Sequence, residues 1–115
     1  MHHVCHIEWD VTDLGRAQKF YGAIFDWTFA EFGGEMVVFS NGGEHIGGLM
    51  RVDRVQPGSS PSVWIQVASV DETALRAQAA GGTLLKPKSP VPGVGWSAVV
   101  GDHDGNPVGV VEFER

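Results

Sequence analysis

The sequence predicts an α+β fold built from two successive modules, each with the element order βαβββ. Three observations support this prediction. Apolar residues first alternate and then recur at helical spacing, glycine-rich breaks separate the β-prone runs that follow, and the same order of elements begins again at residue 62. The chain has 115 residues, which is enough to bury a core without disulfides. We therefore expect a single domain with module one over 1–55, a linker over 56–61 and module two over 62–115.

Module one opens with a strand from Val4 to Val11, in which every second residue is apolar. Thr12 or Asp13 can cap the helix that follows, because apolar residues then recur three or four positions apart as far as Phe25. Glycine-rich breaks predict three short strands after this helix, over 27–32, 36–40 and 45–52. Trp9 and Trp27 fit the helix-packing side of the module, and we expect them in its core, while Tyr21 lies in the apolar stripe of the helix and is expected to be structural.

Module two repeats this order, and Asp71 corresponds to Asp13, 58 residues earlier. An alternating strand over 62–69 precedes a helix that opens at Asp71 and runs from Glu72 to about Ala80. Strands are expected over 83–86, 96–101 and 107–113, and the aspartate-rich segment 102–106 should be a tight turn. We expect the proline-rich segment 87–93 to be a loop, because proline cannot serve a central ladder.

Composition excludes several classes of function. With 14 acidic and 8 basic residues the chain carries a formal charge of −6, which argues against nucleic-acid binding and attachment to anionic membranes. Cys5 is the only cysteine, so neither an intrachain disulfide nor a cysteine zinc cluster can form. The apolar runs are too short to span a bilayer and no secretory leader is visible, so a cytoplasmic location is expected.

Two stretches of the sequence resemble a known superfamily. HIEWDVTDLGRAQKFYGAIFDW is similar to the first strand and helix of the glyoxalase/bleomycin-resistance/dioxygenase superfamily, also called the vicinal oxygen chelate superfamily. VDETALRAQAAGGTLLKPKSPVPGVGWSAVVGDHDGNPVGVVEF is similar to its second module. The resemblance covers nearly the whole chain. It implies cupped mixed sheets around a shared cavity, helices on the outer faces, and assembly as a homodimer.

The resemblance also implies a divalent metal that is held by His and Glu side chains at four matched strand positions. In this sequence those positions are His6, Gly47 (or Gly48, if the alignment shifts by one), Trp64 and Gly109. Only the histidine can bind a metal, whereas a catalytic zinc needs three protein ligands and a non-haem iron needs two histidines and a carboxylate. We therefore predict neither the family's metal nor another cofactor.

A rearranged divalent-metal site made of His6, Glu8 and His45 is the alternative. Glu8 lies two residues after His6, and His45 lies two residues before Gly47, so both are expected on the cavity face. However, residues two apart on a strand are separated by about 7 Å, which spreads these ligands. The N-terminal histidines His2 and His3 could chelate adventitious metal only.

The residues expected to line the cavity share one strand face or its rim. His6, Glu8 and Gln66 would supply polar contacts, Trp64 a surface for stacking, and Trp96 part of the rim. For each there is a plain alternative, namely a satisfied polar residue or a packed aromatic. Glycine at two of the four metal positions would leave space for a ligand. The complete set is His6, Glu8, His45, Gly47, Trp64, Gln66, Trp96 and Gly109.

Three functions follow from these observations. The leading hypothesis is a metal-free, cytoplasmic protein that binds a small, partly apolar or aromatic molecule, as the resistance proteins of the family do. The second is a metal-dependent lyase, isomerase or dioxygenase with a rearranged site. The third is a protein-interaction module whose cavity is closed. The residues themselves identify no catalytic group and no particular ligand.

Overall fold

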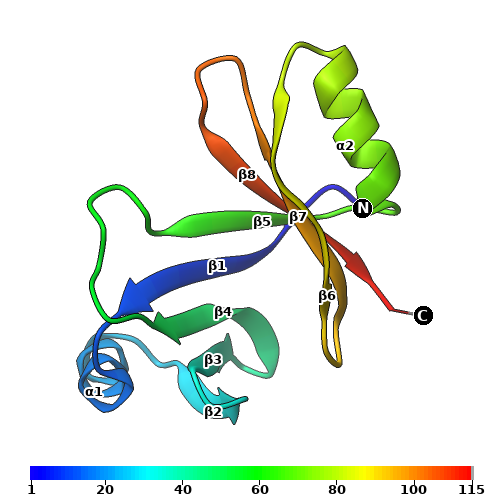
Figure 1. The fold of residues 1–115 in the computed structure, drawn as a ribbon. Coiled ribbons are helices and arrows are strands. Elements are labelled where there is room, and N and C mark those ends of the chain that lie inside the picture. Colours follow the sequence, from blue (N-terminus) through cyan, green and yellow to red (C-terminus); the bar gives the residue numbers. More distant parts are fainter. Residues whose placement is uncertain (115) are drawn as a thin grey trace. The chain divides into compact units, whose positions relative to one another are not determined.

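The computed structural model describes residues 1–114, which form two compact units (Figure 1). The first unit comprises Cys5–Ser62, and the second joins Met1–Val4 to the chain from Val63 onward. The first four residues join the second unit because the backbone of Gln66 pairs with theirs. The His2 N–H donates to the Gln66 carbonyl at 2.9 Å, and the Gln66 N–H donates to the His3 carbonyl at 3.1 Å.

Each unit contains one module with the order βαβββ, which confirms the predicted fold class. The first comprises β1 (Val4–Val11), α1 (Leu14–Ile24), β2 (Thr28–Phe32), β3 (Met36–Asn41) and β4 (Glu44–Arg51). The second comprises β5 (Ser62–Gln66), α2 (Val70–Ala79), β6 (Thr83–Val91), β7 (Gly95–Gly101) and β8 (Pro107–Phe113). Neither of the two helices within residues 1–114 is long and apolar enough to cross a bilayer.

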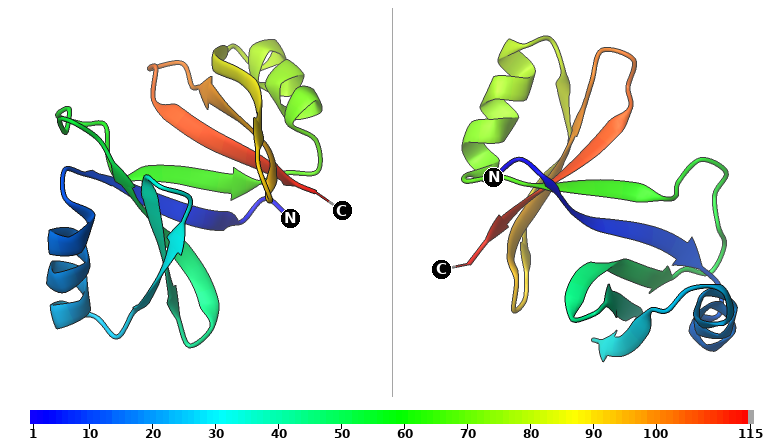
Figure 2. Two further views of the ribbon diagram at one scale, coloured as in Figure 1. Left: turned by 60° about the horizontal axis from the view of Figure 1, so that its bottom comes forward. Right: turned by 180° about the vertical axis from the view of Figure 1, so that it is seen from behind.

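The two modules share one strand topology. In each, the last three strands form an antiparallel meander, and the last strand then pairs in parallel with the first (Figure 2). Ile7 of β1 lies opposite Gly47 of β4, and Trp64 of β5 lies opposite Gly109 of β8. The first strand of each module is thereby held beside the last strand of the same module.

Three elements differ clearly from the predictions. The strand predicted over 62–69 ends at Gln66, because Ser69 caps the following helix. Most of the segment expected to be a loop, residues 87–91, is part of β6, which runs from Thr83 through Pro87 and Pro90 to Val91, and only residues 92–93 lie in the turn that follows. The prolines are tolerated because β6 pairs only with β7 in its unit and its register slips twice between Leu84 and Ser89. The cap of α2 is Ser69 rather than Asp71, since the Ser69 hydroxyl accepts the Glu72 N–H at 3.1 Å.

An aromatic stack joins α1 to the sheet of the first unit. Trp27 stacks on buried Phe39 with ring centroids 4.3 Å apart, and Trp9 stacks on Tyr21 of the helix at 5.3 Å. Buried Leu49 completes this side of the sheet. Trp9, Tyr21 and Trp27 thus pack between α1 and the sheet as expected, but they are half-buried, and the buried residues are Phe39, Leu49 and Val37. The residues that alternate with Trp9 lie on the opposite face of β1.

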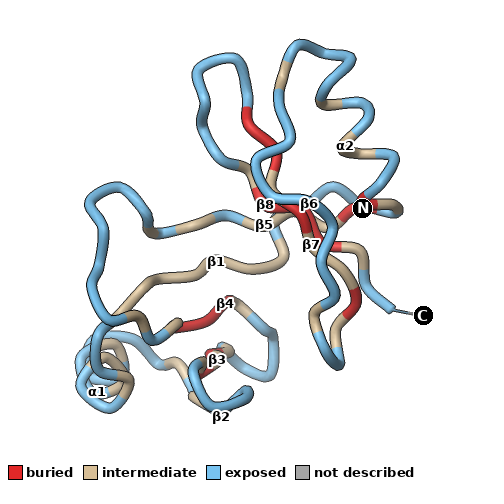
Figure 3. The backbone as a smooth tube through the Cα atoms, in the orientation of Figure 1, coloured by how far each residue is buried: buried red, intermediate tan, exposed pale blue. Residues whose placement is uncertain are grey.

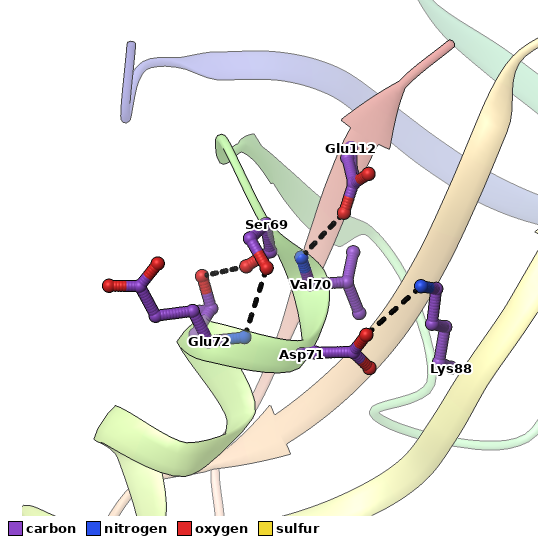
Figure 4. A network of polar contacts seen from close by, with 7 residues as sticks. Ser69, Val70, Asp71, Glu72, Lys88 and Glu112 are labelled. Carbon is purple, nitrogen blue, oxygen red and sulfur yellow. Dashed lines mark hydrogen bonds and ion pairs between the residues drawn. The ribbon is translucent and has the colours of Figure 1, made fainter.

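The core of the second unit lies between α2 and its sheet, where the buried segments of β7 and β8 are found (Figure 3). It consists of Val67, Val70, Ala98 and Val110. Polar contacts fix the start of α2 (Figure 4). The Glu112 carboxylate of β8 accepts the Val70 N–H at 2.9 Å, a favourable place for negative charge at a helix N-terminus. Asp71 pairs with Lys88 of β6 at 3.1 Å.

The parallel pairing in the first unit requires a residue without a side chain at position 47. A Cβ atom on Gly47 would overlap the backbone carbonyl of Ile7 and would lie 3.0 Å from the ring of Phe39. We therefore expect Gly47→Ala to lower the free energy of unfolding by about 2 kcal/mol or more, because neither the strand backbone nor the buried ring can move freely. Chemical denaturation measures this loss.

Gly34→Ala is the matched control, since no atom lies within 4 Å of a Cβ at that turn position. Its unfolding free energy should stay within about 0.5 kcal/mol of the wild-type value. Equal stabilities for the two variants would contradict the close approach of β4 to β1.

Candidate functional site

His6 and Glu8 lie on the face of β1 that points away from the aromatic core. They alternate with Ile7 and Trp9, so the strand itself separates the polar pair from the packed side. Their side chains are 19% and 15% exposed. Nε2 of His6 and a carboxylate oxygen of Glu8 are 2.9 Å apart, so the two side chains reach each other despite the spread of about 7 Å expected along the strand.

His45 joins this pair through an irregularity in β4. Phe39 of β3 lies opposite Gly47, but the next residue, Ser40, lies opposite His45, so Ile46 is an extra residue in β4. Such a bulge reverses the alternation of side chains on either side of it. His45 therefore reaches His6 although Gly47, two residues later, faces the core side.

The three side chains form a continuous hydrogen-bonded chain. Nδ1 of His6 is 2.8 Å from Nε2 of His45, and Nε2 of His6 is bonded to Glu8. The two imidazole planes differ by 13°, which suits a hydrogen bond between ring nitrogens. Both nitrogens of His6 are thus engaged. Partial burial, and then the charge of neighbouring His6, lower the pKa of His45 below its ordinary value.

Gly48 is the glycine that shares a face with His6. It pairs with Glu8 across the parallel strands, and a Cβ atom on it would lie 3.2 Å from Cε1 of His6 and 3.0 Å from Sδ of Met36. A Cβ atom on Gly47 would point to the other side of the sheet. The register therefore supports the alignment that puts Gly48 at the second family position.

Trp64 and Gly109 occupy matching positions in the second unit. They pair between β5 and β8, and the six-membered ring of the Trp64 indole fills the place of a side chain at Gly109. Gln66 also belongs to β5, and both its backbone N–H and its carbonyl bond to the N-terminal segment. The space expected at Gly47 and Gly109 is thus filled by the chain itself.

Trp96 does not join these residues. It packs against the cluster of Val67, Val70, Ala98 and Val110 beside α2, and Nζ of Lys88 lies 5.2 Å from the centre of its ring. This placement gives Trp96 a packing role, the alternative that the sequence left open. Asp102 accepts hydrogen bonds from the backbone N–H groups of Asp104 and Asn106, which confirms the expected tight turn.

The residues present do not fit the family's metal. The four matched positions supply one imidazole, two glycines and an indole. A zinc bound by both histidines would also meet obstacles, because two nitrogens of one tetrahedral zinc lie about 3.3 Å apart, more than the 2.8 Å between His6 and His45. Glu8 is bonded to the other nitrogen of His6, so it cannot share that ion. Within residues 1–114, no group of three His, Cys, Asp or Glu side chains is arranged to hold a metal.

Sequence reasoning missed Met36, which lies beside Gly48 and His6. The register of the hairpin is the feature that places Met36 there. Met36 pairs with Met50, and Met50 lies two residues beyond Gly48 and therefore on the same face. That register could not be counted from the turn at 41–43, since the extra residue Ile46 shifts it.

The structure predicts an unusual titration for His45. We expect its pKa, measured by NMR, to lie below the ordinary histidine value, because partial burial and the His6 charge both disfavour a second cation. His6→Asn removes only the second cause, so the pKa of His45 should rise part of the way back. His3→Asn, a change outside the chain of contacts, should leave it unchanged. A pKa of His45 above the ordinary value in the wild-type protein would contradict the arrangement.

Comparisons with known proteins agree on the fold. The sequence matches the model of the Glyoxalase/Bleomycin resistance protein/Dioxygenase superfamily over residues 3–110. The structure resembles methylmalonyl-CoA epimerase from Mycobacterium tuberculosis, with a TM-score of 0.78 and 14% identity over 97% of this chain and 88% of that one. It also resembles a hypothetical protein from Bacillus halodurans C-125, with a TM-score of 0.75 and 15% identity over 99% and 96% of the two chains.

A third similar structure is an extradiol ring-cleaving dioxygenase from B. fuscum, with a TM-score of 0.73 and 19% identity. The match covers 100% of this chain but 33% of the dioxygenase, so this chain spans about a third of that protein. None of the curated proteins matches. At these identities the structural likeness shows a common fold.

Proposed function

This chain belongs to the glyoxalase/bleomycin resistance protein/dioxygenase superfamily, and we propose that it binds a small, partly apolar or aromatic molecule without the family's divalent metal. The observation that carries this proposal is the pair of hydrogen bonds made by the His6 ring. Both of its ring nitrogens are engaged, by Glu8 and by His45, and the other family ligand positions hold glycine or tryptophan. A protein that used the family's Lewis-acid chemistry would need those positions for the metal.

The face of the first unit that carries His6 supports the binding of such a molecule. It combines a few polar groups, namely His6, Glu8 and His45, with the half-buried side chain of Met36 and the side-chain-free strand at Gly48. Small-molecule sites have this character, with apolar surface and a few oriented polar groups. In the second unit, the indole of Trp64 is proposed as a surface on which an aromatic ligand stacks.

The main competing function is a metal-dependent lyase, isomerase or dioxygenase that recruits His6 and His45 by moving them apart. The second competing function is that of a protein-interaction module. The homodimer and the cytoplasmic location also remain proposals.

Metal analysis distinguishes a metal-free binding protein from a metal-dependent enzyme. The protein should be prepared without a tag and with His2 and His3 replaced by alanine, since these terminal histidines can chelate metal themselves. After treatment with a chelator and reloading with Zn²⁺, Mn²⁺ or Fe²⁺, we expect much less than one ion per chain, because no three ligands converge. Mass spectrometry of the washed protein measures the ratio. One ion per chain that is lost in His6→Ala but retained in His103→Ala would contradict a metal-free function.

Ligand screening tests the binding itself. A small aromatic ligand at about 100 times its dissociation constant should stabilise the metal-free protein by about 2.7 kcal/mol, which appears as a rise in Tm. We expect Glu8→Leu to reduce this rise more than Glu31→Leu, since Glu31 lies in β2, apart from the hydrogen-bonded chain. A broad panel of metabolites and aromatic compounds that leaves Tm unchanged would favour the protein-interaction module.

A further inference from the structure

Helix α1 leaves a stripe of large apolar side chains uncovered. None of its residues is buried (Figure 3), and Phe20 and Ile24, which lie four residues apart on one face, are 58% and 54% exposed. Tyr21, on the adjoining face, stacks on Trp9 of the sheet. The apolar arc of α1 is therefore wider than the part that the sheet covers. Contiguous apolar surface of this kind marks an interaction face.

The stripe borders a groove on the surface of the first unit. The groove has a volume of about 400 Å³ and is lined by Val11, Ala17, Phe20 and Val55, among others. Phe20 thus belongs both to the groove and to the stripe, and Ile24 lies one turn further along the helix. A hollow apolar surface and a projecting apolar side chain therefore follow one another along α1.

The charges of α1 run against its helix dipole. Apart from the N-cap Asp13, its first turn has no acidic residue and its last turn no basic one. Its basic residues are Arg16, near its N-terminus, and Lys19, at its middle, and Asp26 follows its C-terminal end. A helix by itself prefers acidic groups at its N-terminus and basic groups at its C-terminus, and α2 follows this rule.

These charges also have no ion-pair partner within the part of the chain that the structure describes. Among residues 1–114, neither Arg16 nor Lys19 lies within ion-pair distance of a carboxylate, and Asp26 has no basic group within that distance. In α2, by contrast, each charged side chain is paired, as Glu72 is with Arg76. The surface of α1 thus carries positive charge towards one end and negative charge just beyond the other.

We propose that α1 is a dimer interface, in which it packs antiparallel against α1 of a second copy of this chain. A two-fold axis level with Gly22 puts Ile24 of each copy opposite Phe20 of the other, at the apolar groove. The same axis brings Lys19 of each copy level with Asp26 of the other, so charges without a partner in one chain attract across the interface. This inference gives the homodimer an interface, and it does not rest on the proposed binding of a small molecule.

A second copy is the occupant that this surface fits, because the surface is complementary to itself. It supplies the groove and the side chain that enters it, and it supplies both signs of charge at matching levels of the helix. α1 has 11 residues and is therefore about 16 Å long, which makes the interface small. We expect a dissociation constant on the order of micromolar, and sedimentation equilibrium of the full chain measures it.

Two matched variants locate the interface. Ile24→Glu puts a charge into the apolar contact and should raise the dissociation constant of the dimer at least about tenfold, as the loss of a central interface residue does. Leu75→Glu is the control, since Leu75 lies on α2 and is even more exposed, at 67%. It should leave the dissociation constant unchanged. Thermal unfolding of each variant establishes that it is folded.

An exchange of charges tests the antiparallel arrangement. Lys19→Glu and Asp26→Lys, each alone, bring like charges together across the interface, so each should weaken the dimer. The double variant with both changes has opposite charges there again and should dimerise about as well as the wild-type protein. Added salt should weaken the wild-type dimer, because it screens exposed charges.

Three outcomes would overturn the proposal. A wild-type protein that stays monomeric far above micromolar concentration would leave the stripe on α1 to a different partner. A dimer unchanged in Ile24→Glu would be held together by another face. A double charge variant that dimerises less well than either single variant would contradict the antiparallel pairing. None of these outcomes bears on small-molecule binding, which the metal and ligand experiments test separately.

Discussion

The close parallel pairing of the first and last strands in each module is the constraint on which the structure depends. In the first unit this pairing leaves no room for a side chain at Gly47, because the carbonyl of Ile7 occupies that place. In the second unit the indole of Trp64 covers Gly109. Both glycines are thus required by packing. A side chain cannot be added at Gly47 or Gly109 without moving a strand or an indole, whereas a Cβ atom at Gly48 would meet only side chains, those of Met36 and His6.

The same pairing creates the chain of hydrogen bonds on the other face of the first sheet. Gly48 lies opposite Glu8, so the imidazole of His6 can lie over the strand and use both of its nitrogens. A metal-bound histidine commonly donates its second nitrogen to a carboxylate, as His6 does to Glu8. Here both ring nitrogens of His6 are engaged, one by Glu8 and the other by His45.

Much of the fold could be predicted from the sequence because local patterns determine it. The alternation from Val4 to Val11 gave the first strand, and Asp13 caps the first helix as one of the two candidates, accepting the N–H of Arg16. The errors lie where tertiary context decides. Pro87 and Pro90 can be part of a strand only because that strand is paired on one side within its unit.

The candidate site was harder to predict, because its register depends on one extra residue. Counting by twos put His45 and Gly47 on the same face as His6. The bulge at Ile46 separates them, so His45 contacts His6 while Gly48 replaces Gly47 beneath it. No composition or spacing reveals such a bulge in a single sequence. The contact between His6 and Glu8 likewise depends on side-chain directions that the rise along a strand does not give.

The most direct test of this account is the nitrogen NMR spectrum of the histidine side chains, recorded before and after the addition of Zn²⁺ to the chelator-treated protein. The protein should lack His2 and His3, as in the metal analysis. We predict that one equivalent of Zn²⁺ leaves the nitrogen resonances of His6 and His45 in place, because both ring nitrogens of His6 are already engaged, by Glu8 and by His45. A shift of the His6 and His45 nitrogens that saturates at one equivalent would contradict it.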